Sequence, residues 1–436
     1  MQCGAQCSFG TCVPASVRLH DSPASLWHAI PAGPAVLLSA AAAANLRAGM
    51  ITLFDEPQHT ERSPAAADRD RDVDQDFLRS RERPVEAAQG APLVDLFSSF
   101  GGLTFGALEG LRRCGTPGHL CLAVDHEPAA LRVLRDTLGG KDQRYACADL
   151  SALLAPLAGK ARRDERELFG RVKAGDALLF AGPPCQGHSA LNNHTRHDDP
   201  RNDLYLSVAR VARLIEPKAI VIENVQSVGS DRRGVVARCA AALEELGYEV
   251  SPKRLDLNRI GVPQTRIRHL LVATQDVAFQ WKLAELPGRD VRWAIEDLLE
   301  LEGATYIDSP SRPTRENQGR IDWLFENGAS DLPNELRPRC HQSNHSYRSM
   351  YGRLRWDAPA QTVTSGFGSM GQGRYVHPRR RRTLTPHEAA RLQCLPDYVR
   401  LATETRRSIL ATMIGNAAPP LLAARIVEAL HEQQLL

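Results

Sequence analysis

The chain has 436 residues, and its 54 Lys and Arg residues against 51 Asp and Glu residues leave a net charge of +3, which indicates no particular partner. Ten cysteines occur without a C-x-x-C pair, which excludes a disulfide scaffold or a zinc ribbon and favours a reduced, intracellular protein. No apolar run reaches the roughly 18 residues of a membrane span, and residues 35–44 are too short and too far from the N-terminus for a signal peptide.

Residues 1–90 differ in composition from the rest of the chain. Residues 1–49 are rich in Ala, Ser and Cys without amphipathic period, and Met50 opens a more ordinary start, so we expect Met50 to be the true initiator. Residues 55–90 are crowded with Asp, Glu and Arg, which is typical of a solvated tail. We therefore expect residues 1–90 to form a disordered N-terminal extension.

Alternating strand and helix patterns begin at residue 93. Short apolar runs predict strands at residues 93–97, 120–125, 177–181, 219–223 and 270–274. Helical patterns lie between them and at residues 128–138, 386–393 and 421–433. This alternation predicts an α/β fold in which a parallel sheet is covered by helices on both faces.

The alternation is interrupted once, which predicts how the domains are organised. Residues 91–275 form the expected α/β domain, and residues 276–380 form a smaller, irregular, strand-rich region with many Gly, Pro, Arg and Ser residues. Residues 381–436 resume the helical pattern, so we expect this segment to return to the α/β domain.

Charge is segregated within and just beyond the irregular region. Residues 276–335 hold 6 basic and 13 acidic residues, whereas residues 336–391 hold 11 basic and 2 acidic residues. The basic half also contains the aromatic residues Tyr347, Tyr351, Trp356, Phe367 and Tyr375. Arginines interleaved with aromatic residues are typical of a surface that binds a polyanion, and a solvated basic face is the alternative.

A strand at residues 93–97, a turn with Gly101 and Gly102, and a helical pattern after it are typical of a site for a nucleotide-like cofactor at the carboxyl edge of an open parallel sheet. Asp125, at the end of the second strand, is placed to hold ribose hydroxyls, and Asp149 is placed to accept from an adenine amine. Each carboxylate alone also fits a cap or a surface position. Their order along the chain is what favours a nucleoside cofactor.

A second candidate site lies where Cys185 follows two prolines at the end of the strand at residues 177–181. Glu223 ends another expected strand, so both side chains should lie on the same sheet edge. A thiolate beside a carboxyl group can activate a pyrimidine: sulfur adds to C6, the acid hydrogen-bonds N3, and C5 becomes nucleophilic. A buried structural cysteine is the alternative reading of Cys185.

Taken together, these motifs resemble those of the DNA (cytosine-5) methyltransferase family, in the family's order and over roughly residues 93–430. The matching segments are residues 95–103, 183–186, 199–202, 223–225, 264–268, 382–393 and 415–420. The resemblance implies a Rossmann-like, S-adenosyl-L-methionine-dependent methyltransferase domain. It also implies that residues 276–380 are a target recognition domain that reads bases in the major groove.

The resemblance implies a role for each matching residue. Cys185 would form a covalent adduct, Glu223 would act at N3 of a flipped-out cytosine, and Arg266 and Arg268 would contact the base and its phosphate and steady Glu223. The implied cofactor-binding residues are Phe97, Gly101, Gly102, Asp125, His126, Asp149, Pro184 and Asn416. The implied DNA-binding residues are Gln186, Arg353, Arg355, Thr362 and Arg374.

Two residues depart from the family's pattern. Ser99 replaces a usual glycine in the first motif, and His188 stands where Phe is common after the catalytic cysteine. Neither change touches Cys185 or Glu223, so we expect an active enzyme. His341 and His345 have no further ligand nearby, and no metal site is predicted.

The resulting prediction is a monomeric, cytoplasmic bacterial enzyme that methylates cytosine at C5 in specific sequences of double-stranded DNA. It would serve in restriction-modification or another form of phage defence, with a cognate restriction endonuclease encoded nearby. A tRNA cytosine-5 methyltransferase of similar architecture is one alternative, although the basic half of the irregular region favours duplex DNA. A catalytically silent DNA-binding regulator is another, against which the intact Cys185, Glu223 and Arg268 argue.

Overall fold

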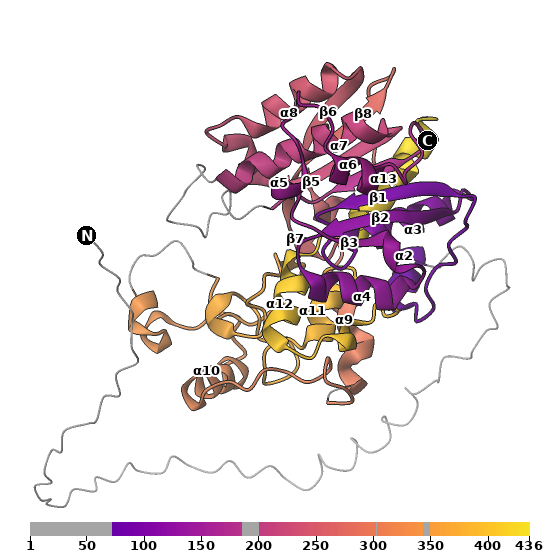
Figure 1. Cartoon of the computed structure of the whole chain (residues 1–436). Coiled ribbons are helices and arrows are strands. Elements are labelled where there is room, and N and C mark those ends of the chain that lie inside the picture. Colours follow the sequence, from indigo (N-terminus) through magenta and orange to yellow (C-terminus); the bar gives the residue numbers. More distant parts are fainter. Residues whose placement is uncertain (1–71, 185–199, 302, 343–348) are drawn as a thin grey trace, which may run out of the picture. The chain divides into compact units, whose positions relative to one another are not determined.

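The computed structural model describes residues 72–184, 200–301, 303–342 and 349–436, and its centre is a seven-stranded sheet (Figure 1). The strand order is β3-β2-β1-β4-β5-β8-β6. These strands are β1 (Ala91–Leu96), β2 (Gly118–Asp125), β3 (Tyr145–Cys147), β4 (Leu178–Ala181), β5 (Ala219–Val225), β6 (Tyr248–Asp256) and β8 (Ile267–Gln275). The chain order reverses between β1 and β4, which is where open α/β sheets form a binding crevice.

The predicted α/β fold is confirmed, and all five predicted strands are present, while β3 and β6 were not predicted. Strands β1 to β5 are parallel, but β8 runs antiparallel between β5 and β6, so the expectation of a wholly parallel sheet is wrong there. Only residues 257–266 separate β6 from β8. A parallel crossover needs a dozen or more residues, so this short connection requires antiparallel pairing.

Helices cover both faces of the sheet, as the alternating pattern predicts. Side chains of α3, α4 and α13 pack on one face against residues such as Leu93, Phe180 and Val221. Side chains of α7 and α8 pack on the other face against Val94 and Ile220. The helices are α2 (Val73–Arg79), α3 (Gly102–Arg113), α4 (Pro128–Leu138), α5 (Leu150–Leu153), α6 (Arg163–Phe169), α7 (Ser207–Ile215), α8 (Val235–Glu244), α9 (Val291–Ile295), α10 (Arg315–Glu326), α11 (Pro386–Leu392), α12 (Arg407–Asn416) and α13 (Pro420–Glu432).

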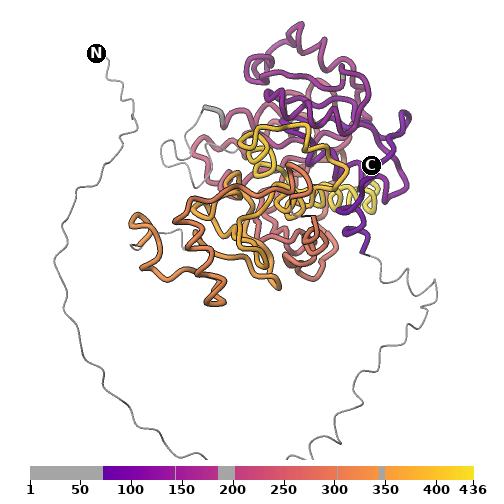
Figure 2. Tube along the Cα trace, turned by 90° about the horizontal axis from the view of Figure 1, so that it is seen from below, coloured from indigo at the N-terminus to yellow at the C-terminus, as the bar shows by residue number. Residues whose placement is uncertain are grey.

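A row of glycines lets α13 lie very close to α3, so that the last helix completes the core formed by the first strands. Figure 2 shows the C-terminal helix (yellow) beside the first part of the described chain (indigo). A Cβ added at Gly106 would lie 1.9 Å from the carbonyl oxygen of Pro420, and one at Gly102 would lie 2.4 Å from that of Ala418. Backbone oxygens cannot move aside as a flexible side chain can, so these positions exclude any side chain.

We therefore expect Gly106→Ala to lower the free energy of unfolding by about 1–3 kcal/mol, the usual cost of overpacking a core. Gly319→Ala is the matched control, because Gly319 lies inside α10 and an added Cβ there meets nothing within 4 Å. That change should stabilise the protein by roughly 0.5–1 kcal/mol, since alanine restricts the unfolded chain. Urea unfolding of both variants tests the prediction, and equal effects of the two changes would contradict it.

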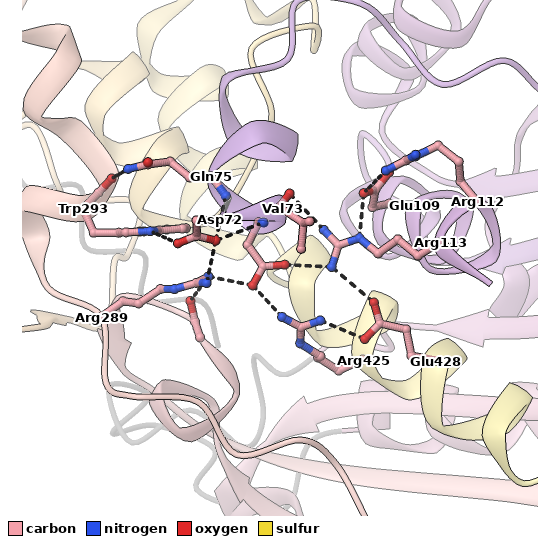
Figure 3. A network of polar contacts seen from close by, with 12 residues as sticks. Asp72, Val73, Gln75, Glu109, Arg112, Arg113, Arg289, Trp293, Arg425 and Glu428 are labelled. Atoms are coloured by element: carbon pink, nitrogen blue, oxygen red, sulfur yellow. Dashed lines mark hydrogen bonds and ion pairs between the residues drawn. The ribbon is translucent and has the colours of Figure 1, made fainter. Parts of the chain in front are cut away.

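Helix α2 lies within the N-terminal extension that the sequence led us to expect to be disordered, so that prediction is wrong for this segment. Asp72 caps the helix, and Phe77 and Leu78 are buried in the main core. The Asp74 carboxylate, 1% exposed, binds the guanidinium groups of Arg113, Arg289 and Arg425 (Figure 3). Residues 1–71 lie outside the described part of the chain.

The network in Figure 3 extends beyond Asp74. The Asp72 carboxylate accepts from Arg289 at 2.9 Å and from the indole Nε1 of Trp293 at 2.7 Å. Glu428 on α13 binds both Arg113 and Arg425. One buried network thus connects α2 with α3, with the start of the irregular region and with the last helix.

The described part of the irregular region at residues 276–380 holds less strand than expected. Its short strand β9 (Ala360–Gln361) pairs with β7 (Gln264–Thr265), and isolated bridges join Val376 to Arg353 and Thr383. A small separate core of Ile321, Leu324, Leu332, Tyr351, Met370 and Val376 stabilises the region around α10.

One stretch of the described chain, Arg407–Glu432, is long and apolar enough to cross a membrane by length and composition alone. It comprises α12 and α13, and 67% of its most apolar window is buried inside the protein. Its apolar character is therefore accounted for by packing against α3 and the sheet.

Candidate active site

A cavity of about 1060 Å³ opens at the carboxyl edge of the sheet, where the strand order reverses. Five of the predicted cofactor-binding residues line it, and they come from the ends of three neighbouring strands and the loop after β3. These residues are Phe97, Asp125, His126, Asp149 and Pro184.

The other three predicted cofactor-binding residues are not among the residues that line the cavity. Gly101 begins α3 with φ of 100°, and a Cβ there would lie 2.5 Å from the Leu134 side chain. Gly102 faces the backbone of Ala418, and Asn416 is exposed at the end of α12. In this structure the two glycines permit close packing beneath the cavity.

The turn between β1 and α3, from which Phe97 lines the cavity, contains unusual backbone geometry. Phe97 and Ser99 both have positive φ, 56° and 48°, in the left-handed region that non-glycine residues rarely adopt. The Ser99 N–H donates to the Asp125 carboxylate at 2.7 Å, and the Ser98 N–H donates to the carbonyl oxygen of Val124. Ser99 thus adopts a left-handed conformation that glycine takes without strain, and the Asp125 hydrogen bond holds it there.

Two carboxylates face the cavity with part of their hydrogen-bonding capacity unused. Asp125 accepts from the N–H groups of Ser99 and Glu127 and is only 8% exposed. Asp149 caps α5, and hydrogen bonds from Ser151 lower the pKa of its carboxyl group. Each ionised carboxylate has further lone pairs that can accept from hydroxyl or amine groups, as a nucleoside presents.

Asp95, one residue before the end of β1, is a buried carboxyl group beneath this turn. Its Oδ2 accepts from the Thr104 hydroxyl at 2.6 Å, whereas Oδ1 is buried without a hydrogen-bond partner among the described residues. Burial, reinforced by the nearby Asp125 carboxylate, raises the pKa of Asp95 to about 7. The group therefore titrates near neutral pH.

This raised pKa predicts a pH-dependent stability. The unfolded chain releases the Asp95 proton near pH 3.9 and the folded chain only near pH 7, so the free energy of unfolding falls as pH rises between these values. Asp95→Asn has no carboxyl group to ionise and so avoids this pH-dependent loss of stability. Its free energy of unfolding, relative to that of wild type, should rise by on the order of a few kcal/mol from pH 5 to pH 8. Urea unfolding at both pH values tests this, and a pH-independent difference would contradict it.

Glu223 and Arg268 form an ion pair beside the cavity, on the adjacent strands β5 and β8. The Nε of Arg268 lies 2.6 Å from Oε1 of Glu223, and each side chain is 11% exposed. The contact lacks the geometry of a hydrogen bond, so the carboxyl oxygens retain lone pairs for another donor. The Arg268 Nη1 donates to the carbonyl oxygen of Ile267, which orients the guanidinium.

Asn224, beside Glu223, connects this pair to the segment that leads to Cys185. Its Nδ2 donates to the carbonyl oxygen of Pro183 at 3.2 Å, and both groups are buried. Strands β4 and β5 are parallel neighbours. Pro184, just after β4, and Glu223, near the end of β5, therefore lie at the same edge of the sheet. Cys185, Gln186 and His188 lie outside the described residues.

Arg266 occupies a different position from Arg268, deep in the protein at 2% exposure. Its described hydrogen bonds go to the carbonyl oxygens of Val363 and Ala417 and to Oε1 of Gln393. Gln264 joins the same cluster by donating to Gln393 and accepting from the Val363 N–H. The sequence predicted no role for Gln264 or Gln393. The only signal for them in the sequence is that each belongs to one of the matching motifs.

The predicted DNA-binding residues differ in how far their side chains are already engaged. The Thr362 hydroxyl donates to the carbonyl oxygen of Thr265 next to β7, and Arg374 binds Asp331 at 2.6 Å. Arg355 is exposed beside Asp357. Arg353 stacks on Phe325, with its guanidinium carbon 4.6 Å from the ring centroid.

Ion pairs neutralise part of the basic half, residues 336–391. Arg374, Arg381 and Arg391, from the basic half, each bind an acidic residue of the preceding half, and Arg382 binds Glu388. The pairs are Arg374–Asp331, Arg381–Asp322, Arg381–Glu326, Arg391–Asp297 and Arg382–Glu388. The basic surface inferred from residue counts is therefore smaller than the counts suggest. Among the described residues, no group of three or more His, Cys, Asp or Glu side chains is placed to hold a metal ion.

Residues 92–432 match the sequence profile of the C-5 cytosine-specific DNA methylase family. The chain belongs to this family. The match extends from the first strand of the sheet to the last helix of this DNA (cytosine-5) methyltransferase, and the predicted family membership and enzyme class are confirmed.

Curated relatives of this methyltransferase include two type II enzymes. The "Type II methyltransferase M1.BsuMI" of Bacillus subtilis (strain 168) is 38% identical over 372 residues, which cover 82% of this chain and 84% of that protein. The "Type II methylase M.HgiDII" of Herpetosiphon aurantiacus is 30% identical over 370 residues, 78% of this chain and 97% of that protein.

Solved structures share the fold of this methyltransferase at low sequence identity. A putative DNA modification methyltransferase encoded within an Escherichia coli prophage has a TM-score of 0.54 at 21% identity and covers 78% of this chain and 98% of its own. The Dnmt2 methyltransferase of S. pombe has a TM-score of 0.50 at 18% identity, covering 79% and 99%. These similarities confirm the Rossmann-like fold.

Proposed function

We propose that this DNA methyltransferase acts on specific sequences of double-stranded DNA, where it methylates a flipped-out cytosine at C5 through a covalent adduct with Cys185. The Glu223–Arg268 ion pair carries the proposal, because it places a carboxyl group with free lone pairs on the sheet edge that leads to Cys185. The type II relatives support a role as the modification enzyme of a restriction-modification system.

The cavity at the carboxyl edge fits S-adenosylmethionine, the methyl donor of this enzyme class. About 1060 Å³ accommodates a nucleoside and its amino-acid chain, and the Asp125 and Asp149 carboxylates are acceptors suited to hydroxyl and amine groups. Phe97 and His126 line the same cavity and offer ring surfaces to a base. When bound, S-adenosylmethionine supplies a methyl group that is electrophilic because of its sulfonium charge.

The residues of the chain then perform the activation of the cytosine ring. The Cys185 thiolate forms a bond to C6 and the electron pair of the 5,6 double bond moves to C5, while Glu223 protonates or hydrogen-bonds N3. C5 takes the methyl group as the carbon–sulfur bond of the donor breaks, which would leave a neutral thioether. Solvent takes the C5 proton, the electron pair of the C5–H bond re-forms the 5,6 double bond and expels the Cys185 thiolate, and N3 returns its proton to Glu223. Arg268 keeps the Glu223 carboxyl in place through these steps.

A methyl-transfer assay with the purified full chain tests the proposal. Labelled S-adenosylmethionine is supplied with unmethylated duplex DNA and, in parallel, with unmodified tRNA, and the DNA product is mapped by bisulfite sequencing. We expect label at one short DNA motif and no transfer by Cys185→Ala. Label only in tRNA would assign the enzyme to RNA modification. Binding of DNA without transfer to either substrate would support the regulator reading.

A further inference from the structure

The guanidinium of Arg353 has no carboxylate partner among the described residues, unlike those of Arg374, Arg381 and Arg391 in the same basic half. Its contact is with an aromatic ring: the guanidinium carbon lies 4.6 Å from the centroid of Phe325 on α10. By contrast, Arg381, which stacks on the same ring at 5.6 Å, also binds Asp322 and Glu326. The two arginines thus share one ring, but only Arg381 is neutralised by acidic groups.

The position of Arg353 is fixed by its backbone and its ring contact. Its N–H donates to the carbonyl oxygen of Ser330 at 2.8 Å, and its own carbonyl oxygen accepts from Arg374 at 3.3 Å. A bridge to Val376 joins it to the small core around α10. A guanidinium held against a ring on such a platform loses little further rotational freedom when it binds a ligand.

This arrangement costs free energy in the unbound protein. The Nε–H of Arg353 is buried and has no acceptor among the described residues, and burial lowers the pKa of the guanidinium. Leaving a buried donor unsatisfied is destabilising, and more so when it is charged. Natural proteins retain such unfavourable features chiefly at functional sites.

We propose that Arg353 is a specificity-determining residue that reads a guanine of the target site in the major groove. This inference rests on the proposed function and assigns one of its sequence-reading contacts. The planar end of a guanidinium donates two parallel hydrogen bonds, which match O6 and N7 of guanine. A partly desolvated, ring-stacked arginine suits this directional contact, whereas exposed, flexible cations suffice for phosphates.

The test begins with the target site that bisulfite mapping gives for the wild-type enzyme. Synthetic duplexes carry that site, each with one guanine replaced by 7-deazaguanine, which lacks the N7 acceptor. We expect one position at which wild type loses about ten- to hundred-fold in kcat/KM, the usual discrimination of a bidentate base contact. Arg353→Gln should show the same loss on the unmodified site and no further loss at that position.

Arg381→Gln is the matched control, because this arginine stacks on the same ring and is already paired. On every duplex of the 7-deazaguanine series, the kcat/KM of Arg381→Gln should stay within about threefold of the wild-type value. Arg353→Lys keeps the charge and should resemble Arg353→Gln, and thermal unfolding of all three variants verifies folding. A uniform loss on all sequences with a weaker salt dependence would instead make Arg353 a phosphate contact and overturn the inference. Full activity of Arg353→Gln on wild-type target DNA would also overturn it, while leaving the proposed function intact.

Discussion

Replacing Glu223 by glutamine is expected to lower kcat for methyl transfer to DNA by about 10²–10⁴-fold, the usual contribution of a general acid. Glutamine keeps the shape of the side chain but cannot give a proton to N3 of cytosine. The Glu223 carboxyl lies on β5, 2.6 Å from Arg268, and is largely shielded from water. Single-turnover methyl transfer with saturating DNA and S-adenosylmethionine measures the effect.

Arg268→Lys separates proton transfer from positioning at the same site. Lysine keeps the positive charge but loses the fork that reaches both Glu223 and the carbonyl oxygen of Ile267. We expect a smaller fall in kcat than for Glu223→Gln. Cofactor binding by both variants should remain close to wild type, because neither residue lines the cofactor cavity. A Glu223→Gln enzyme within threefold of wild-type kcat would exclude Glu223 as the acid.

Replacing Asp74 by alanine is expected to lower the free energy of unfolding by about 3–5 kcal/mol, the usual cost of breaking a buried ion pair. The change leaves Arg113, Arg289 and Arg425 with one buried anion fewer, although Glu109 and Glu428 still pair with two of them (Figure 3). Urea unfolding at neutral pH measures the loss. Methyl transfer below the unfolding transition should be little changed, since no residue of α2 lines the cavity at the carboxyl edge of the sheet or takes part in the Glu223–Arg268 pair.

Stability of the Asp74 network should also decline in acid. Burial raises the pKa of Asp74, but the charges of Arg425, Arg113 and Arg289 outweigh it and hold the pKa below its usual value. The network therefore contributes fully to the free energy of unfolding above about pH 4, where Asp74 is ionised in the unfolded chain as well. This contribution is lost as the pH falls through the lower pKa that Asp74 has in the folded protein. Asp142→Asn is the control, because Asp142 is 88% exposed and its change should cost less than about 0.5 kcal/mol. Equal losses for the two variants would contradict a buried network.

The sequence was sufficient to predict most of the sheet and the order of its functional segments. Strands such as β1 and β5 are nearly continuous apolar runs, because parallel strands are buried on both faces. The residues after each run then meet at one edge by topology alone, and so Asp125 and Glu223 could be placed before any coordinates. Antiparallel β6 is half exposed and carries Glu249, Lys253 and Arg254, so its run lacked this signal.

Helix α2 and the charge pairing could not be predicted for a different reason. Asp74 lies 215 residues from Arg289 and 351 residues from Arg425 along the chain, so its local sequence reads as a polar tail. Likewise, counts of charged residues show that acids precede bases in the irregular region, but not that Asp331 meets Arg374. Local patterns record which surfaces are apolar, whereas long-range ion pairs depend on the assembled fold.

The close contact between α3 and α13 has a consequence for synthesis of the enzyme on the ribosome. Helix α3 is made early, but the groove along Gly102, Gly106 and Gly110 is filled only by residues near 418–427. The nascent chain must therefore hold an apolar groove open until more than 300 further residues have been translated. A modification enzyme built this way gains its activity late, only after the last helix has left the exit tunnel.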